Sequence, residues 1–200
     1  MDFGVVKNYV MNTTRSNKIV NMYLDIALGL VIGFLVSIFS GEHSFILILF
    51  GVVAALAPDI DFIVHLIQRK GKVDHYAHEH RDLLHKPLLF SAGIGLLIGL
   101  WNPLYGIVWC LGTLWHFIHD TFDGGWGIRW FHPFYFGYFT IAPYSPKRHF
   151  RNKREQHEYA TLHGNPNWLE DDYFRLNRRL ITEWILLTVA LVFIFVWTLK

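Results

Sequence analysis

Apolar runs, each about as long as a membrane is thick, are the feature that most constrains this 200-residue chain. A bilayer hydrocarbon core of about 30 Å needs roughly 20 helical residues to cross it. Five runs approach this length, at residues 19–39, 44–67, 87–101, 104–122 and 181–199. The third run is the shortest, so its ends need burial in protein. We therefore expect an all-α integral membrane bundle of about five transmembrane helices.

The composition supports a lipid environment and excludes several kinds of site. Hydrophobic residues make up 52% of the chain and charged residues only 17%, whereas a soluble domain needs charged side chains to cover its surface. The net charge of +2 is too small to indicate a nucleic-acid partner. Cys110 is the only cysteine, which excludes an intrachain disulfide and a metal site built from thiolates. Any metal must therefore be held by nitrogen and oxygen atoms.

The basic residues indicate the orientation of the bundle. Lys and Arg occur before the first run, between the second and third, and between the fourth and fifth, whereas the connections 40–44 and 101–103 contain none. Because Lys and Arg concentrate in cytoplasmic loops, we expect the N-terminus and both basic connections inside and the C-terminus outside. No segment resembles a cleavable signal peptide, so the first run is expected to remain an anchor in the inner, cytoplasmic membrane.

These observations divide the chain into four parts. We expect a cytoplasmic N-terminal segment, the transmembrane bundle, a cytoplasmic basic interfacial segment and a C-terminal transmembrane helix, at residues 1–18, 19–135, 136–180 and 181–200. Aromatic residues crowd positions 126–139, which is typical of a membrane-interface belt. Residues 147–163 are strongly charged and are predicted to form a surface helix or loop on an anionic leaflet.

Ionisable residues inside the predicted spans are the strongest indication of a functional site, because such residues are costly in lipid. They gather toward the cytoplasmic ends of three spans and in the loop after the second, as Asp25, Asp59, Asp61, His65, His80, His85, His116, His119 and Asp120. His116 and Asp120 are four residues apart and share one helix face, as two ligands of a divalent ion commonly do. The sequence therefore predicts a divalent metal site at the cytoplasmic face, with zinc as the expected ion.

Structural interpretations of the same residues stay open. Asp25 could be the partner of a nearby Arg, His65 could reach to the membrane interface, and the remaining span residues could form a purely structural polar network. Pro58 removes a backbone hydrogen bond and can break the second helix. A broken helix at membrane depth is tolerated where it lines a polar cavity, which fits a site beside Pro58.

Three motifs, taken in order along the chain, resemble a known family. They are LAPDID at 56–61, HRDLLH at 80–85 and HFIHD at 116–120. Together they resemble the LPDID, histidine–arginine and H-x-x-x-D motifs of the YdjM-like membrane-bound metal-dependent hydrolases, over about residues 20–135. Two positions depart from that pattern: Asp25 stands where the family usually has a histidine, and the loop lacks the family's glycine and its Thr-His-Ser flank.

The resemblance implies a hydrolase and a division of roles among the polar residues. The expected catalytic groups are Arg81, whose planar guanidinium matches a phosphate, and Asp61 or His119, as a general base or as a support for a ligand imidazole. The expected metal ligands are Asp25, Asp59, His80, His85, His116 and Asp120. A site at the membrane face suits an amphiphilic phosphoester such as a phospholipid, so membrane lipid is the expected partner.

Functions of other classes compete with hydrolysis. A metal transporter would use the same residue types but would need a polar path across the bilayer, and the third and fifth runs offer almost nothing for one. A non-catalytic scaffold stabilised by a metal would need only a closed ligand set, drawn from the same residues. A haem protein is disfavoured, because only the fourth run offers plausible histidine ligands inside a span.

Overall fold

The computed structural model describes residues 22–72, 77–122, 126–141, 147–163 and 178–198. This part of the chain is mainly helical and contains only two short strands, which confirms the all-α expectation. The predicted N-terminal segment 1–18 lies outside the described residues.

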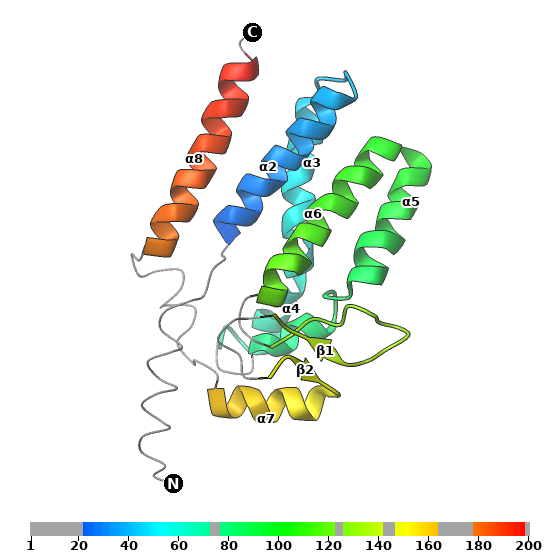
Figure 1. Ribbon diagram of the computed structural model, residues 1–200, viewed down its shortest axis with the longest axis vertical. Coiled ribbons are helices and arrows are strands. Elements are labelled where there is room, and N and C mark those ends of the chain that lie inside the picture. The colour runs from blue at the N-terminus through cyan, green and yellow to red at the C-terminus, as the bar shows by residue number, and fades with distance from the viewer. Residues whose placement is uncertain (1–21, 73–76, 123–125, 142–146, 164–177, 199–200) are drawn as a thin grey trace.

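The apolar runs form helices that lie beside one another. They are α2 (Met22–Phe39), α3 (Phe45–Leu56), the π-helical turn η3 (Leu88–Gly93) with α5 (Ile94–Trp101), α6 (Pro103–Phe122) and α8 (Arg178–Thr198). Successive helices run in opposite directions (Figure 1). The start of α2, the ends of α3 and α6 and the start of α8 therefore lie at the same end of the molecule.

Polar residues at the opposite end define where helices stop and start. The Ser44 hydroxyl accepts a hydrogen bond from the Leu47 N–H at 3.3 Å and so caps α3. Asn102 accepts a hydrogen bond from the Leu104 N–H at 2.9 Å, and Pro103 occupies the first position of α6, where its missing N–H is not needed. These tight connections force α2 against α3 and α5 against α6.

Glycines allow α2 and α3 to approach closely. Gly29 and Gly33 are four residues apart on α2 and face Gly51 on α3. A Cβ added to Gly29 would lie 2.6 Å from the carbonyl oxygen of Gly51, so the helix backbones are in contact. Small residues at this spacing are a common way to pack helices in lipid. Asp25, one turn before Gly29, is thereby held in a defined position relative to α3.

Gly51→Val is expected to lower the free energy of unfolding by about 1–3 kcal/mol, the range typical of overpacking. The added Cβ would collide with the carbonyl oxygen of Gly29, which is backbone and has no room to move. The measurement is chemical unfolding in detergent. Gly93→Val is the matched control, because a Cβ at Gly93 would meet only the Leu88 oxygen, at 3.9 Å. Equal stability of the two variants would contradict the close approach of α2 and α3.

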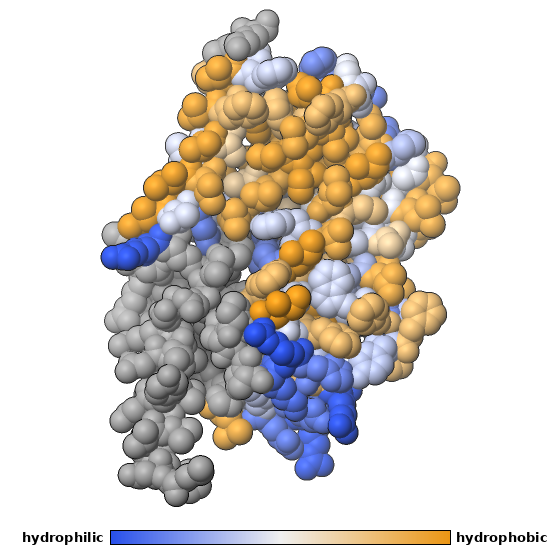
Figure 2. All heavy atoms as spheres, in the orientation of Figure 1, coloured by the Kyte–Doolittle hydropathy of each residue, from blue (hydrophilic) through white to orange (hydrophobic). Residues whose placement is uncertain are grey.

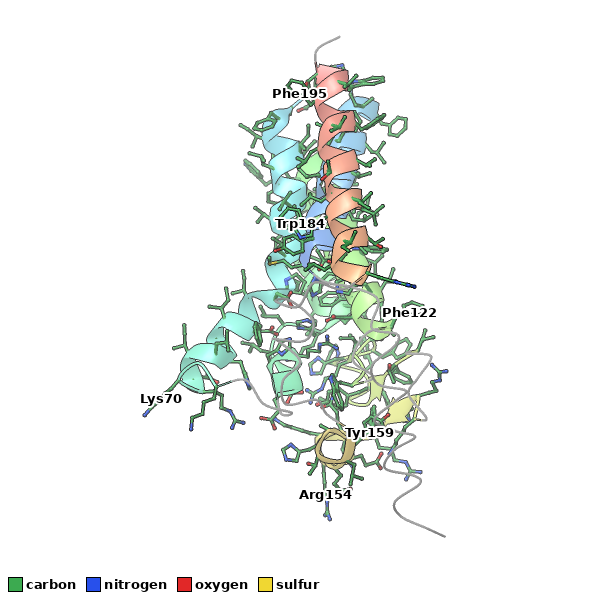
Figure 3. The ribbon with its side chains drawn as sticks, turned by 90° about the vertical axis from the view of Figure 1, so that its left-hand side faces the viewer. Lys70, Phe122, Arg154, Tyr159, Trp184 and Phe195 are labelled. Atoms are coloured by element: carbon green, nitrogen blue, oxygen red, sulfur yellow. The ribbon has the colours of Figure 1, made fainter. Side chains whose placement is uncertain are left out.

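The second predicted span is broken at Pro58, as expected. α3 ends at Leu56, the 3-10 turn η1 (Ala57–Asp59) follows, and α4 (Ile60–Gln68) continues in a new direction. Figure 3 shows α4 leaving the bundle toward Lys70. The break places Asp59 at the junction between a helix inside the bundle and a helix that departs from it.

The number of membrane spans stays a prediction. Three helical stretches of the described chain are long and apolar enough to cross a membrane: α2, residues 45–68 taken across the break, and 180–198 within α8. Leu88–Trp101 is apolar but shorter. α6 has 20 residues but carries polar groups of the site described below.

A small layer covers the end of the bundle at which α3 and α6 finish (Figure 1). It contains η2 (Ala77–Asp82), the antiparallel strands β1 (Tyr138–Phe139) and β2 (His149–Phe150), and α7 (Lys153–His163). The surface helix predicted within 147–163 is α7. The strands were not predicted, because two residues are too few to show an alternating pattern.

The surface changes character between the bundle and this layer. Hydrophobic residues cover the helices of the bundle, and hydrophilic residues gather at the end that carries α7 (Figure 2). The division fits a bundle in lipid with a polar layer at one membrane face.

Candidate metal centre

Four side-chain atoms converge where α3 and α6 end. Nε2 of His85 lies 3.0 Å from Oδ2 of Asp120 and 3.8 Å from Oδ1 of Asp59. Nε2 of His116 lies 3.4 Å from the same Asp59 oxygen and 3.7 Å from the same Asp120 oxygen. These four separations are near the roughly 3.3 Å between ligand atoms that lie about 2.0–2.1 Å from a zinc ion. One ligand atom each from His85, His116 and Asp120 also fall within 4.8 Å of one another. We call the four converging atoms the four-atom centre.

Local structure explains how the four atoms meet. His116 and Asp120 share a face of α6, Asp59 lies at the break after α3, and His85 follows η2. α6 packs closely on α3, since a Cβ added to Gly112 would lie 2.9 Å from the Cβ of Ala54. This contact brings the end of α3 beside the end of α6.

Three atoms of the centre lack hydrogen bonds. Nε2 of His85, Nε2 of His116 and Oδ2 of Asp120 are buried, and among the described residues none has a hydrogen-bond partner. They approach one another without the geometry of donor and acceptor. Buried polar atoms without a partner are costly, and an ion is one of the accepted explanations. The nitrogen and oxygen donors present therefore fit a divalent cation.

Carboxylates lie behind the imidazoles of the four-atom centre. Oδ2 of Asp61 forms a 3.0 Å hydrogen bond with Nδ1 of His85 and accepts another from the Leu84 N–H. Oδ2 of Asp25 lies 3.3 Å from Nδ1 of His116. Carboxylate–histidine pairs of this kind leave Nε2 to face a metal. The structure thus favours the supporting role for Asp61 over the general-base role.

Asp25, predicted from the sequence as a metal ligand, lies outside the four-atom centre. Its other oxygen, Oδ1, lies 2.8 Å from Nδ1 of His119. Asp25, His116 and His119 form a group of their own that could hold an ion. Asp25 therefore stays a predicted ligand, as a member of this second group, and lies behind His116 as seen from the four-atom centre.

His80 lies beside His85, with ring centroids 5.3 Å apart. One ligand atom each from Asp59, His80 and His85 fall within 4.8 Å of one another. Burial, together with the nearby charges of His85 and Arg81, lowers the pKa of His80 to about 4. Its imidazole is therefore neutral at pH 7, as a metal ligand must be.

Arg81 and His119 surround the second oxygen of Asp120. A terminal guanidinium nitrogen of Arg81 lies 2.8 Å from Oδ1 of Asp120 in a buried ion pair, and Nε2 of His119 lies 3.4 Å from the same oxygen. Asp120 thus turns one oxygen to the four-atom centre and the other to Arg81. In this structure the anion beside Arg81 is the Asp120 carboxylate, and phosphate binding by Arg81 stays a prediction.

An ion-pair network that the sequence did not predict holds η2 from outside. Asp82 accepts a 2.6 Å hydrogen bond from the Tyr138 hydroxyl and lies 2.8 Å from Nζ of Lys153 and 3.1 Å from Arg129. Burial opposes the charge of Asp82, but Lys153, Tyr138 and Arg129 outweigh it and lower its pKa. The network joins α7 and β1 to the segment that carries His80 and Arg81. Only its charged residue types were visible in the sequence.

Asp82→Ala is expected to destabilise the protein by about 1–3 kcal/mol, because it removes the carboxylate that Tyr138, Lys153 and Arg129 share. Thermal unfolding in detergent measures the change. Glu158→Ala is the matched control, since the Glu158–Arg154 pair on α7 is exposed and should contribute less than about 0.5 kcal/mol. If Asp82→Ala lowered the stability no more than Glu158→Ala, the network would not be what positions η2.

A comparison with known protein families shows which family this chain belongs to. The family described as YdjM inner membrane protein matches residues 25–200, a range that holds every residue of the centre. The chain belongs to the YdjM family. This match confirms the resemblance of the three motifs. The family is one of inner membrane proteins, and the long apolar helices of the chain agree with that location. No curated protein and no solved structure matches the chain.

Proposed function

We propose that this YdjM protein is a metal-dependent hydrolase of a phosphoester such as a phospholipid. The observation that carries the proposal is the uneven burial of the four-atom centre. The side chains of His85, His116 and Asp120 are at most 5% exposed, whereas that of Asp59 is 40% exposed. A structural metal site is closed on all sides, and a catalytic one keeps an accessible position. The exposed edge at Asp59 favours catalysis over a scaffold.

The residues of the four-atom centre and those beside it have defined parts in this proposal. A bound divalent ion, with zinc expected, would supply a Lewis acid that polarises a phosphoryl oxygen and makes water more acidic. His85, His116, Asp59 and Asp120 would hold it, with His80 as a further donor. Asp61 and Asp25 keep the imidazoles of His85 and His116 in place. The exposed carboxylate of Asp59 can also accept a proton from water.

The phosphoester class and the cytoplasmic face belong to the same proposal. A guanidinium one residue from a candidate ligand suits a phosphate, and Arg81 occupies that position beside His80. Lys and Arg gather on the side of the bundle that carries the centre, which supports placing it in the cytoplasm.

Metal analysis followed by a hydrolysis screen tests the proposal. The purified protein should contain a stoichiometric divalent metal and should hydrolyse a phosphodiester or a phospholipid. A chelator should abolish the activity, and added zinc should restore it. Bound metal without hydrolysis of any phosphoester would favour the scaffold instead.

A further inference from the structure

An exposed apolar stripe occurs on α3 and again on α4, on the two sides of the break at Pro58. On each helix its residues are three or four positions apart, which is one helix face: Ile46, Leu49 and Val53 on α3, and Ile60, Ile63 and Ile67 on α4. On α3 such a face is expected to meet lipid. After the break at Pro58, the stripe on α4 lies on a helix that has left the bundle.

The opposite face of α4 is polar and buried. Asp61 and His65 point into the protein, while Ile63 is 57% and Ile67 73% exposed. α4 is therefore amphipathic, unlike the uniformly apolar α3. Arg69, Lys70 and Lys72 follow at its end. An apolar face that ends at basic residues is typical of a helix lying in the plane of a membrane interface.

Lipid is the occupant that best explains the exposed face of α4. The face follows the exposed apolar stripe on α3 along the chain, and large apolar side chains of this exposure would be unfavourable in water. Asp59 precedes this face directly, one turn before Ile63. A carboxylate that is 40% exposed is tolerated at headgroup depth but not among acyl chains. The accessible edge of the centre and the apolar face of α4 therefore adjoin.

We propose that α4 lies at the boundary between headgroups and acyl chains, and that the metal centre opens sideways into the leaflet at Asp59. Its substrate is then the headgroup phosphoester of a lipid that remains in the bilayer. The position of α4 stands on its own, whereas the substrate rests on the proposed function.

Spin labels in liposomes test the position of α4. Cys110 is the only cysteine, so Cys110→Ser gives a background for single labels at Ile63→Cys and Ile67→Cys. Both labels should collide readily with oxygen and poorly with a water-soluble nickel chelate, as Val53→Cys should on α3. Leu162→Cys on the polar helix α7 is the matched control and should show the reverse. Labels at 63 and 67 that behave like the one at 162, or that are shielded from both reagents by another protein chain, would overturn the placement.

A substrate comparison tests the sideways opening. Ile63→Glu should lower the ratio of turnover of bilayer dioleoylphosphatidylglycerol to turnover of soluble bis(4-nitrophenyl) phosphate by about tenfold or more. Leu162→Glu should leave this ratio unchanged. An unchanged ratio in Ile63→Glu would overturn lateral access even if the spin labels lie in lipid. If the wild-type protein hydrolyses neither probe, the proposed function and the lipid substrate both fail, while the labels still decide the position of α4.

Discussion

His116→Ala is expected to weaken zinc binding by more than about a hundredfold, which exceeds the loss typical of a supporting residue. The reason is that Nε2 of His116 lies near both carboxylates of the four-atom centre. Its removal would leave the expected ion with only three of the four donor atoms. Titration against a chelator of known affinity, in detergent, measures the change.

Two comparison variants make the test specific. Asp61→Asn keeps the shape of the residue behind His85 but removes its charge, and should weaken zinc binding by about ten- to a hundredfold. His43→Ala removes an exposed histidine at the opposite end of the bundle, between α2 and α3. This variant should leave the zinc affinity unchanged. Undiminished zinc affinity in His116→Ala would leave the four-atom centre without support.

Asp120→Ala is expected to lower the free energy of unfolding of the metal-free protein by about 3–5 kcal/mol. The reason is the buried ion pair with Arg81, whose guanidinium would keep its charge but lose its carboxylate partner at 2.8 Å. Chemical unfolding in detergent with excess chelator measures this loss without a contribution from bound metal.

The double variant Arg81→Met/Asp120→Ala separates the pair from other contacts. Methionine removes the guanidinium charge that Asp120→Ala deprives of its carboxylate, and it fills a similar volume, so the double variant should recover most of the lost stability. A double variant as unstable as Asp120→Ala would mean that Arg81 is not the residue on which Asp120 acts.

The sequence was enough to predict the helices, the break and the residue types that gather at the candidate site. Hydrophobic length is a local property, and so is the effect of Pro58 on the backbone hydrogen bonds of its own helix. The types of donor were equally readable, since one cysteine leaves only nitrogen and oxygen ligands. The order of the three motifs was sufficient to recognise the YdjM family.

Only the tertiary structure decided which atom of each residue faces the centre. Asp25 and Asp59 looked alike in the sequence, because both are acidic residues near span ends. The close contact of α2 with α3 places Asp25 behind His116, while the break at Pro58 turns Asp59 toward its Nε2. The register between packed helices depends on contacts between residues far apart in the chain, which local periodicity does not contain. The same holds for Asp82, whose partners lie on α7 and β1 and became neighbours only when the chain folded.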